Sequence, residues 1–312
     1  MPTENSASVR RIGAATCCRA VVASARGAVR PRRPTRAELA AVPQTELPPA
    51  RATVRFVALP QVSRPVPAPF VVEGARSSRR LQIGLRTYVI EHPQCRILLD
   101  PSISTSVRDR TLSAMPEPLR LAVTPPADVL STVEALHVGG FDGADIDFAL
   151  PTHLHWDHVS GLSDLPGLAT VVHRPEWDWA MTGMIAPVAG VRPAMSGREI
   201  RNYELDGPPV LTFPHSHDLF GDGAVLLLDL AGHTPGSVGI LLNTERGRLL
   251  VAGDAAWHHD QIDQAAQKPG FPGILVDEDR DATFETLVRL HIARSTVEIL
   301  PTHDHVLATR WE

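Results

Sequence analysis

Short apolar runs recur along the chain after residue 80, and residues that favour turns separate them. Apolar runs of about four to eight residues, bounded by Gly, Pro, Asn or Asp, are typical of β-strands. Turns at 92–94 and 245–247 each lie between two such runs and therefore predict hairpins. The predicted strands are 81–91, 95–100, 144–150, 169–173, 224–230, 237–243, 248–252 and 296–300.

Apolar residues at helical spacing occur between these strands. The first predicted helix runs from a cap at Asp128 to about Val138, and the second covers 176–184. A third helix is capped by Asp281, and its apolar face is formed by Phe284, Leu287, Val288 and Ile292. Strands with helices between them predict an α/β (α+β) protein in which layered sheets are covered by helices.

Residues 1–50 differ from the rest of the chain. They contain eight Arg against three Glu, are rich in Ala, Pro and Ser, and lack aromatic residues. This composition predicts a disordered extension and linker before a single domain at 51–312. The alternative is a cleaved targeting segment that starts at Arg10-Arg11, but Arg19 interrupts its apolar stretch. A cytoplasmic protein is therefore expected, with export as the weaker alternative.

Composition and charge exclude several classes of protein. The chain of 312 residues is 43% hydrophobic and 21% charged, which is ordinary for a globular protein. The net charge of -5, with basic residues dispersed past residue 80, argues against a nucleic-acid partner. No run of 18 apolar residues occurs, so no membrane partner is expected. Three Cys argue against a disulfide scaffold and fit a reducing compartment.

Residues 153–158 read His-Leu-His-Trp-Asp-His, which places four potential metal ligands in six positions. In an extended backbone, residues two apart point to the same side, so His153 and His155 point together and Asp157 comes next in the series. His158 points elsewhere unless the backbone turns. Two ligands for one metal ion and two for a neighbouring ion is the simplest interpretation. Imidazole and carboxylate ligands suit Zn²⁺, and also Fe, Mn or Co.

Three further candidate ligands each follow the end of a predicted strand. They are His233, Asp254 and His303, after the strands at 224–230, 248–252 and 296–300. Loops on a rigid scaffold are a recurrent position for binding and catalytic residues. His305 lies two residues after His303 and is the alternative ligand at that strand end.

The chain resembles the metallo-β-lactamase-fold hydrolases over roughly residues 53–312. The matching motifs are the Thr-His-Leu-His-Trp-Asp-His run at 152–158, Gly-His-Thr-Pro-Gly-Ser at 232–237, Gly-Asp at 253–254 and His-Asp at 303–304. The resemblance implies an αββα sandwich of two mixed β-sheets flanked by helices, with a dinuclear metal centre at the sheet edge. It implies that one metal is held by His153, His155 and His233, the other by Asp157, His158 and His303, and that Asp254 bridges both.

The resemblance also implies an activity. Two divalent ions, Zn²⁺ being expected first, would hold a bridging hydroxide that cleaves an ester, lactone or thioester bond of a small molecule. Asp157 and Asp254 would be the catalytic carboxylates, with Asp157 passing a proton to the leaving group. Phosphodiester or sulfate-ester hydrolysis on the same centre and a non-hydrolytic di-iron redox role are the alternatives. A homodimer is left open.

The nearest branch of that family is the one that contains N-acyl-homoserine lactonases. Asp254 stands where true metallo-β-lactamases commonly carry a Cys, so antibiotic hydrolysis is not expected. The lactonases usually have a Tyr three residues after the bridging Asp, where this chain has Trp257. Trp257 is therefore the candidate substrate-pocket residue, and its indole N–H can donate a hydrogen bond. The segments 56–80, 175–200 and 258–275 are predicted to be largely irregular and to shape the pocket.

Overall fold

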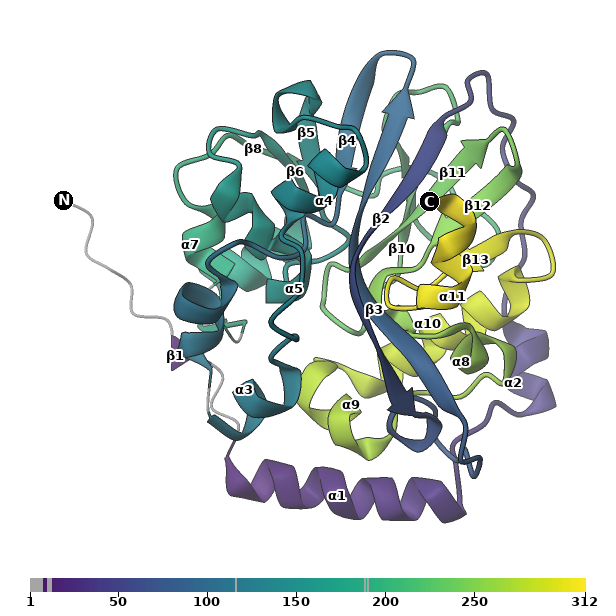
Figure 1. Cartoon of the computed structure of the whole chain (residues 1–312). Helices are drawn as coiled ribbons and strands as arrows, with labels where there is room; N and C mark the ends of the chain where they lie inside the picture. Colours follow the sequence, from purple (N-terminus) through teal and green to yellow (C-terminus); the bar gives the residue numbers. More distant parts are fainter. Residues whose placement is uncertain (1–7, 10–12, 116, 188, 190) are drawn as a thin grey trace.

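Two mixed β-sheets lie face to face in the computed structural model, which describes residues 8–9, 13–115, 117–187, 189 and 191–312 (Figure 1). One sheet has the strand order β2-β3-β4-β5-β6-β8, and the other has the order β13-β12-β11-β10-β9. The first sheet comprises β2 (Arg55–Pro67), β3 (Arg80–His92), β4 (Cys95–Leu99), β5 (Phe148–Leu150), β6 (Thr170–His173) and β8 (Ile200–Tyr203). The second comprises β9 (Ser216–Asp218), β10 (Val225–Asp229), β11 (Val238–Thr244), β12 (Gly247–Val251) and β13 (Glu298–Leu300).

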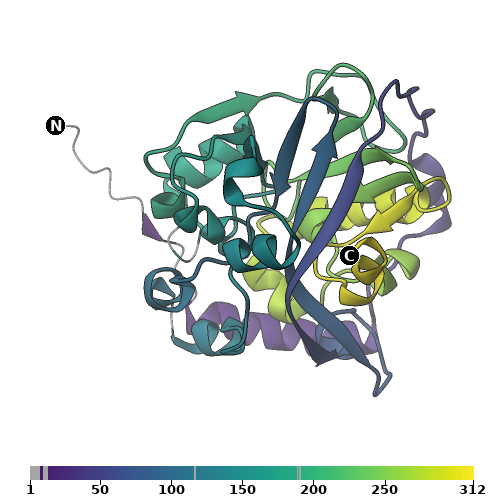
Figure 2. The same cartoon turned by 45° about the horizontal axis from the view of Figure 1, so that its top comes forward.

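Helices cover the outer face of each sheet, and Figure 2 shows the same layers from a second direction. Side chains of both sheets, among them Ile90 and Leu227, form the core between them. Leu136 of α4 (Thr132–Val138) packs on the outer face of the first sheet. Leu287 of α10 (Arg280–Ala293) packs on the outer face of the second sheet. This helix–sheet–sheet–helix arrangement confirms the predicted fold class.

The remaining helices precede β2 or lie in the connections between strands and after β13. They are α1 (Ala14–Val29), α2 (Arg36–Ala41), α3 (Glu117–Val123), α5 (Trp156–Val159), α6 (Arg174–Trp177), α7 (Val191–Met195), α8 (His259–Asp263), α9 (Gly270–Val276) and α11 (His305–Ala308). A small pair of strands, β1 (Ser8–Val9) and β7 (Ile185–Ala186), adds to one side. None of the described helices combines the length and apolar composition that crossing a membrane requires.

The prediction of a disordered extension is wrong for the described part of residues 13–50. Helix α1 packs against α9, and α2 begins with a capping box between Thr35 and Glu38. The following segment lies along the second sheet, where the Thr45 N–H donates to the Leu211 carbonyl oxygen at 2.6 Å. Residues 1–7 and 10–12, on which part of the prediction falls, lie outside the described residues.

Several predicted boundaries also need correction. Helix α4 is capped by Ser131 rather than Asp128, because the Ser131 hydroxyl accepts from Glu134 N–H and completes a capping box. In α10 the cap is Asp279, whose carboxylate accepts from the N–H groups of Asp281 and Ala282. The predicted helix 176–184 is split into α6 and a π-helical turn at Asp178–Thr182.

Strand β2 occupies much of a segment that was predicted to be irregular. Three prolines within 55–67 opposed a strand prediction, since proline cannot donate a ladder hydrogen bond. They are tolerated because β2 pairs only with β3 and forms the edge of its sheet. The predicted strand 144–150 is shorter than expected, because Gly143–Asp145 forms a 3₁₀ turn and only β5 pairs in the sheet.

Candidate metal centre

The seven predicted ligands come together at one edge of the two sheets. His153 and His155 follow β5, and α5 carries Asp157 and His158. The other three follow the ends of β10, β12 and β13 in the order His233, Asp254 and His303. Among these seven, three groups of side chains have their ligand atoms within 4.8 Å of one another. They are His153 with His155 and His233, His153 with His158 and Asp254, and Asp157 with His158 and His303.

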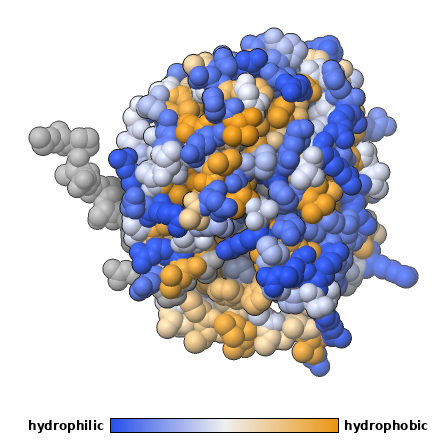
Figure 3. All heavy atoms as spheres, in the orientation of Figure 1, coloured by the Kyte–Doolittle hydropathy of each residue, from blue (hydrophilic) through white to orange (hydrophobic). Residues whose placement is uncertain are grey.

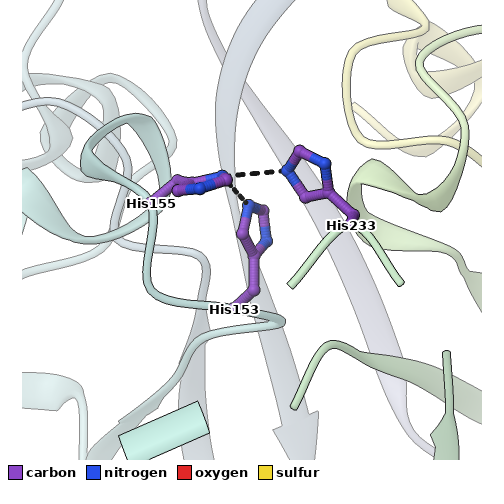
Figure 4. Close-up of side chains that lie close together, drawn as sticks. All are labelled: His153, His155 and His233. Carbon is purple, nitrogen blue, oxygen red and sulfur yellow. Dashed lines mark hydrogen bonds between the residues drawn. The ribbon is translucent and has the colours of Figure 1, made fainter. Parts of the chain in front are cut away.

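The first group is a triangle of imidazole rings (Figure 4). The Nδ1 atom of His155 lies 3.1 Å from Nε2 of His153 and 2.9 Å from Nε2 of His233. Burial, together with the neighbouring imidazoles, lowers the pKa of His153 and His155 well below its usual value. These rings are therefore neutral at physiological pH, which is the form in which histidine binds a metal ion.

Asp254 lies between the two sets of ligands. Its Oδ1 atom is 3.0 Å from Nε2 of His303 and 3.4 Å from Nε2 of His158. Its Oδ2 atom is 3.5 Å from Nε2 of His233. One carboxylate oxygen thus faces each set, which is the geometry that a bridging ligand needs.

Two buried atoms in this cluster lack a hydrogen-bond partner, namely Oδ1 of Asp254 and Nε2 of His158. Buried polar atoms are rarely left without a partner, so this pair requires an explanation such as an ion. An imidazole nitrogen and a carboxylate oxygen that converge in this way suit zinc and similar divalent ions. The residues present therefore fit a metal centre.

Carboxylates and a backbone carbonyl behind the cluster fix the orientation of three of the imidazole rings. The Nδ1 atoms of His158 and His233 lie 2.9 Å from Oδ2 of Asp100 and Oδ1 of Asp277, respectively. His303 Nδ1 donates to the Gly84 carbonyl oxygen at 2.9 Å. A partner at Nδ1 sets the tautomer that leaves Nε2 for a metal, and it fixes the plane of the ring.

A buried ion pair supports Asp277. Lys268 Nζ donates to Oδ1 of Asp277 at 2.8 Å and to the backbone oxygen of Asp254 at 2.7 Å. Burial opposes ionisation of Asp277, but Lys268 and His233 hold its pKa at about 2. Asp277 therefore stays charged, and Lys268 links it directly to the loop that carries Asp254.

Glu176 joins the two loops that carry the histidines. Its carboxylate accepts from Leu154 N–H at 2.7 Å, from the Thr234 hydroxyl at 2.7 Å and from Gly236 N–H at 3.0 Å. Burial raises the pKa of Glu176 to about 7, and these three donors oppose that rise. Gly236 packs on the backbone of Glu176 so closely that a Cβ atom would lie 2.2 Å from its nitrogen.

Sequence reasoning did not identify Asp100, Glu176, Lys268 or Asp277. Asp100 was placed only as the last residue of a predicted strand. An ionisable residue at the end of a buried apolar strand was a usable signal, because such a group needs a partner. Lys268, Asp277 and Glu176 carry no comparable local signal, since their partners lie in other loops.

The alternative ligand His305 and the nearby His259 fall outside the ligand cluster. His305 Nδ1 lies 2.7 Å from a guanidinium nitrogen of the buried Arg86. His259 Nδ1 lies 2.6 Å from Oδ2 of Asp304. Trp257 does reach the cluster, where its indole N–H donates to Oδ2 of Asp254 at 2.8 Å.

A cavity of about 350 Å³ opens above the cluster. His155, Asp157 and Asp254 form part of its floor, and Trp156 and Trp257 add aromatic walls. Most of its other lining is apolar and comes from β2, β3, α3 and α9. Those side chains include Val62, Val66, Ile83, Leu119, Val123, Phe271 and Leu275, and Phe70 of the turn after β2 joins them.

Known proteins resemble this chain in sequence and in fold. An N-acyl homoserine lactonase AttM of Rhizobium radiobacter is 27% identical over 174 residues, which cover 55% of this chain and 63% of that protein. The chain thus spans less than two thirds of the length of this relative. The metallo-hydrolase mfmC of Annulohypoxylon moriforme is 28% identical over 148 residues, or 44% of this chain and 38% of that protein.

Among solved structures, an N-acyl homoserine lactone hydrolase with N-hexanoyl-L-homoserine bound at its catalytic metal centre matches with a TM-score of 0.59. The match covers 83% of this chain and 97% of that one at 18% identity, and so concerns the fold. The family model described as the metallo-beta-lactamase superfamily matches residues 86–306. These residues include all seven candidate ligands, and the chain belongs to the metallo-beta-lactamase superfamily.

Proposed function

We propose that the protein is a dinuclear metal-dependent hydrolase that cleaves an ester, lactone or thioester bond in a small molecule with an extended apolar group. The observation that carries this proposal is the position of Asp254, between two sets of ligands and on the floor of an apolar cavity. The lactonase activity named for the relatives supports the same bond class.

In this proposal His153, His155 and His233 hold one ion, and Asp157, His158 and His303 hold the other. Zn²⁺ is the expected metal, because imidazole nitrogens and carboxylate oxygens are among its usual ligands. The ions would act as Lewis acids that make a water nucleophilic at neutral pH and polarise a carbonyl oxygen. Asp254 contacts both sets of ligands. Asp277 holds the imidazole ring of His233 in place, and Asp100 holds that of His158.

Asp157 is the residue placed to move a proton. Its side chain is 18% exposed and lines the cavity, and its Oδ2 lies 3.7 Å from Nε2 of His303. A carboxylate at the boundary of cluster and cavity can accept a proton and pass it to a leaving oxygen above it. The indole N–H of Trp257 donates a hydrogen bond to Asp254 and so orients that carboxylate. The indole ring also adds apolar surface for the substrate.

The lining of the cavity away from the ligand cluster favours a substrate with an apolar group. Arg64 is the only Lys or Arg among the described residues that line it, while Asp157, Asp254 and Glu278 contribute carboxylates. Asp157 and Asp254 belong to the proposed metal centre, whose two divalent ions would outweigh these carboxylates, so charge alone does not select against an anionic group. Apolar side chains instead stabilise a bound apolar group by about 0.8 kcal/mol for each CH₂ removed from water.

A substrate series tests this function. With metal ions bound, kcat/KM towards aliphatic esters and lactones is expected to rise about fourfold per CH₂ until the cavity is filled, because 0.8 kcal/mol corresponds to that factor. Removing the metal with a chelator abolishes hydrolysis, and adding Zn²⁺ restores it. Faster hydrolysis of a phosphodiester than of any carboxylic ester would contradict the proposal. So would retention of activity after the metal has been removed.

Asp277→Asn is expected to weaken zinc binding by about 10- to 100-fold, the usual cost of losing a partner behind a metal-binding histidine. The amide cannot neutralise the buried Lys268, and it holds His233 less firmly. Competition with a chromogenic chelator measures the affinity. The matched control is Asp281→Asn, at a side chain 82% exposed on α10. Equal zinc affinity in both variants would show that Asp277 does not support the site.

A further inference from the structure

The outer face of α1 is apolar and exposed. Exposed residues recur every three or four positions along the helix, so they share one side. Val21, Val22 and Val29 are 60%, 69% and 70% exposed. The same side carries Ala14, Ala15, Cys18, Ala25 and Ala28. Figure 3 shows hydrophobic residues over the edge of the molecule where α1 lies.

One flank of this face carries only positive charge. Arg19, Arg26 and Arg30 are exposed and lie seven and four residues apart, which places them along the same side of the helix. Residues 5–37 contain eight Arg and neither Asp nor Glu. The surface of α1 is therefore an apolar strip beside a row of guanidinium groups.

The opposite face of α1 is packed tightly on the wall of the cavity. Phe271 N–H donates to the Ser24 hydroxyl at 2.6 Å, and a Cβ atom on Gly270 would lie 2.5 Å from Cβ of Ala23. Helix α9, which begins at Gly270, lines the cavity. Near the C-terminal end of α1, Gly27 packs on Glu73, and Phe70 in the adjoining segment lines the cavity while remaining 53% exposed.

We propose that α1 docks the protein on an anionic lipid surface. Its apolar strip would enter the boundary between headgroups and acyl chains, and Arg19, Arg26 and Arg30 would contact the anionic headgroups. Such docking places the exposed Phe70 at the lipid surface, next to the cavity. This proposal departs from the sequence-based expectation of no membrane partner, which rested on the lack of a spanning segment. It does not depend on the proposed hydrolase activity.

A second copy of the chain is a poorer occupant of this face. Two α1 helices that met through their apolar strips would bring two rows of Arg together without an acidic residue in either helix. Like charges at such short distance oppose association. An anionic lipid surface supplies the negative charge that α1 lacks, and it is also where apolar esters accumulate.

Flotation of the full chain with vesicles tests the proposal. The protein is expected to float with vesicles of equal parts phosphatidylglycerol and phosphatidylcholine, and not with phosphatidylcholine alone. Because charge contributes, binding should fall at high salt. The triple variant R19Q/R26Q/R30Q should bind about 100-fold more weakly or worse. The variant V22Q/V29Q should also lose binding, whereas Val138→Gln, at a site 75% exposed on α4, should bind like the parent.

The outcomes separate docking from its alternatives. Unchanged flotation of both α1 variants, or no flotation of the parent, overturns the proposal. Sedimentation that shows a dimer broken by V22Q/V29Q, without vesicle binding, also overturns it and assigns the face to a second copy. Since the variants leave the metal cluster untouched, hydrolysis of a short soluble ester and the circular dichroism spectrum report separately on activity and folding.

Discussion

Asp254→Asn is expected to lower kcat/KM by roughly 10²- to 10³-fold or more, the loss typical of removing one group that stabilises transition-state charge. The metal content should fall at the same time. The amide keeps the size of the side chain but loses the charge that faces His158 and His303 on one side and His233 on the other. Without that charge, two cations in the cluster would repel each other with no anion between them.

Metal analysis after dialysis and kinetics on one ester measure the two effects of Asp254→Asn. Asp263→Asn is the matched control, because Asp263 is exposed and lies 3.6 Å from Arg294 on the surface. Two bound metal ions and near-parental kinetics in Asp254→Asn would remove Asp254 from its bridging position. Loss of both metals with intact folding would instead support the role, since each set of ligands faces this carboxylate.

The seven candidate ligands could be predicted from sequence because their chemistry restricts the residue type. His153, His155 and His158 fall within one loop, so their spacing is visible locally. His233 and His303 are recognisable as His residues that follow predicted strands. The strands themselves could be predicted where apolar runs are continuous, as in β10 to β12. The structure places these residues together, and their assignment as ligands stays a proposal.

Residues that act through tertiary contacts gave no such signal. Ser24 and Gly270 are nearly 250 positions apart, so nothing near α1 in the sequence shows that an Ala-rich, Arg-rich segment has a packing partner. Composition alone therefore predicted disorder there. The cap of α10 was misplaced by two residues, because both Asp279 and Asp281 are suitable capping residues and only the backbone conformation distinguishes them.

Glu176→Ala is expected to lower the free energy of unfolding by roughly 3 kcal/mol or more. It removes the acceptor of Leu154 N–H, Gly236 N–H and the Thr234 hydroxyl, and each buried donor left without a partner costs about 1–3 kcal/mol. The loops that carry His155 and His233 should then separate more easily. Zinc affinity is therefore expected to fall together with stability.

Denaturant unfolding of the zinc-loaded protein measures the stability change, and Glu285→Ala, at an exposed position on α10, is the matched control. Glu176→Gln gives a sharper test of the mechanism. The glutamine side chain keeps the size of the glutamate and one acceptor oxygen. Its second oxygen is replaced by an NH₂ group, which cannot accept a hydrogen bond from the donors that the carboxylate binds. The stability of Glu176→Gln should therefore lie between those of the parent and Glu176→Ala. If Glu176→Gln and Glu176→Ala unfold like the control, the two loops are held by their own packing and not by this carboxylate.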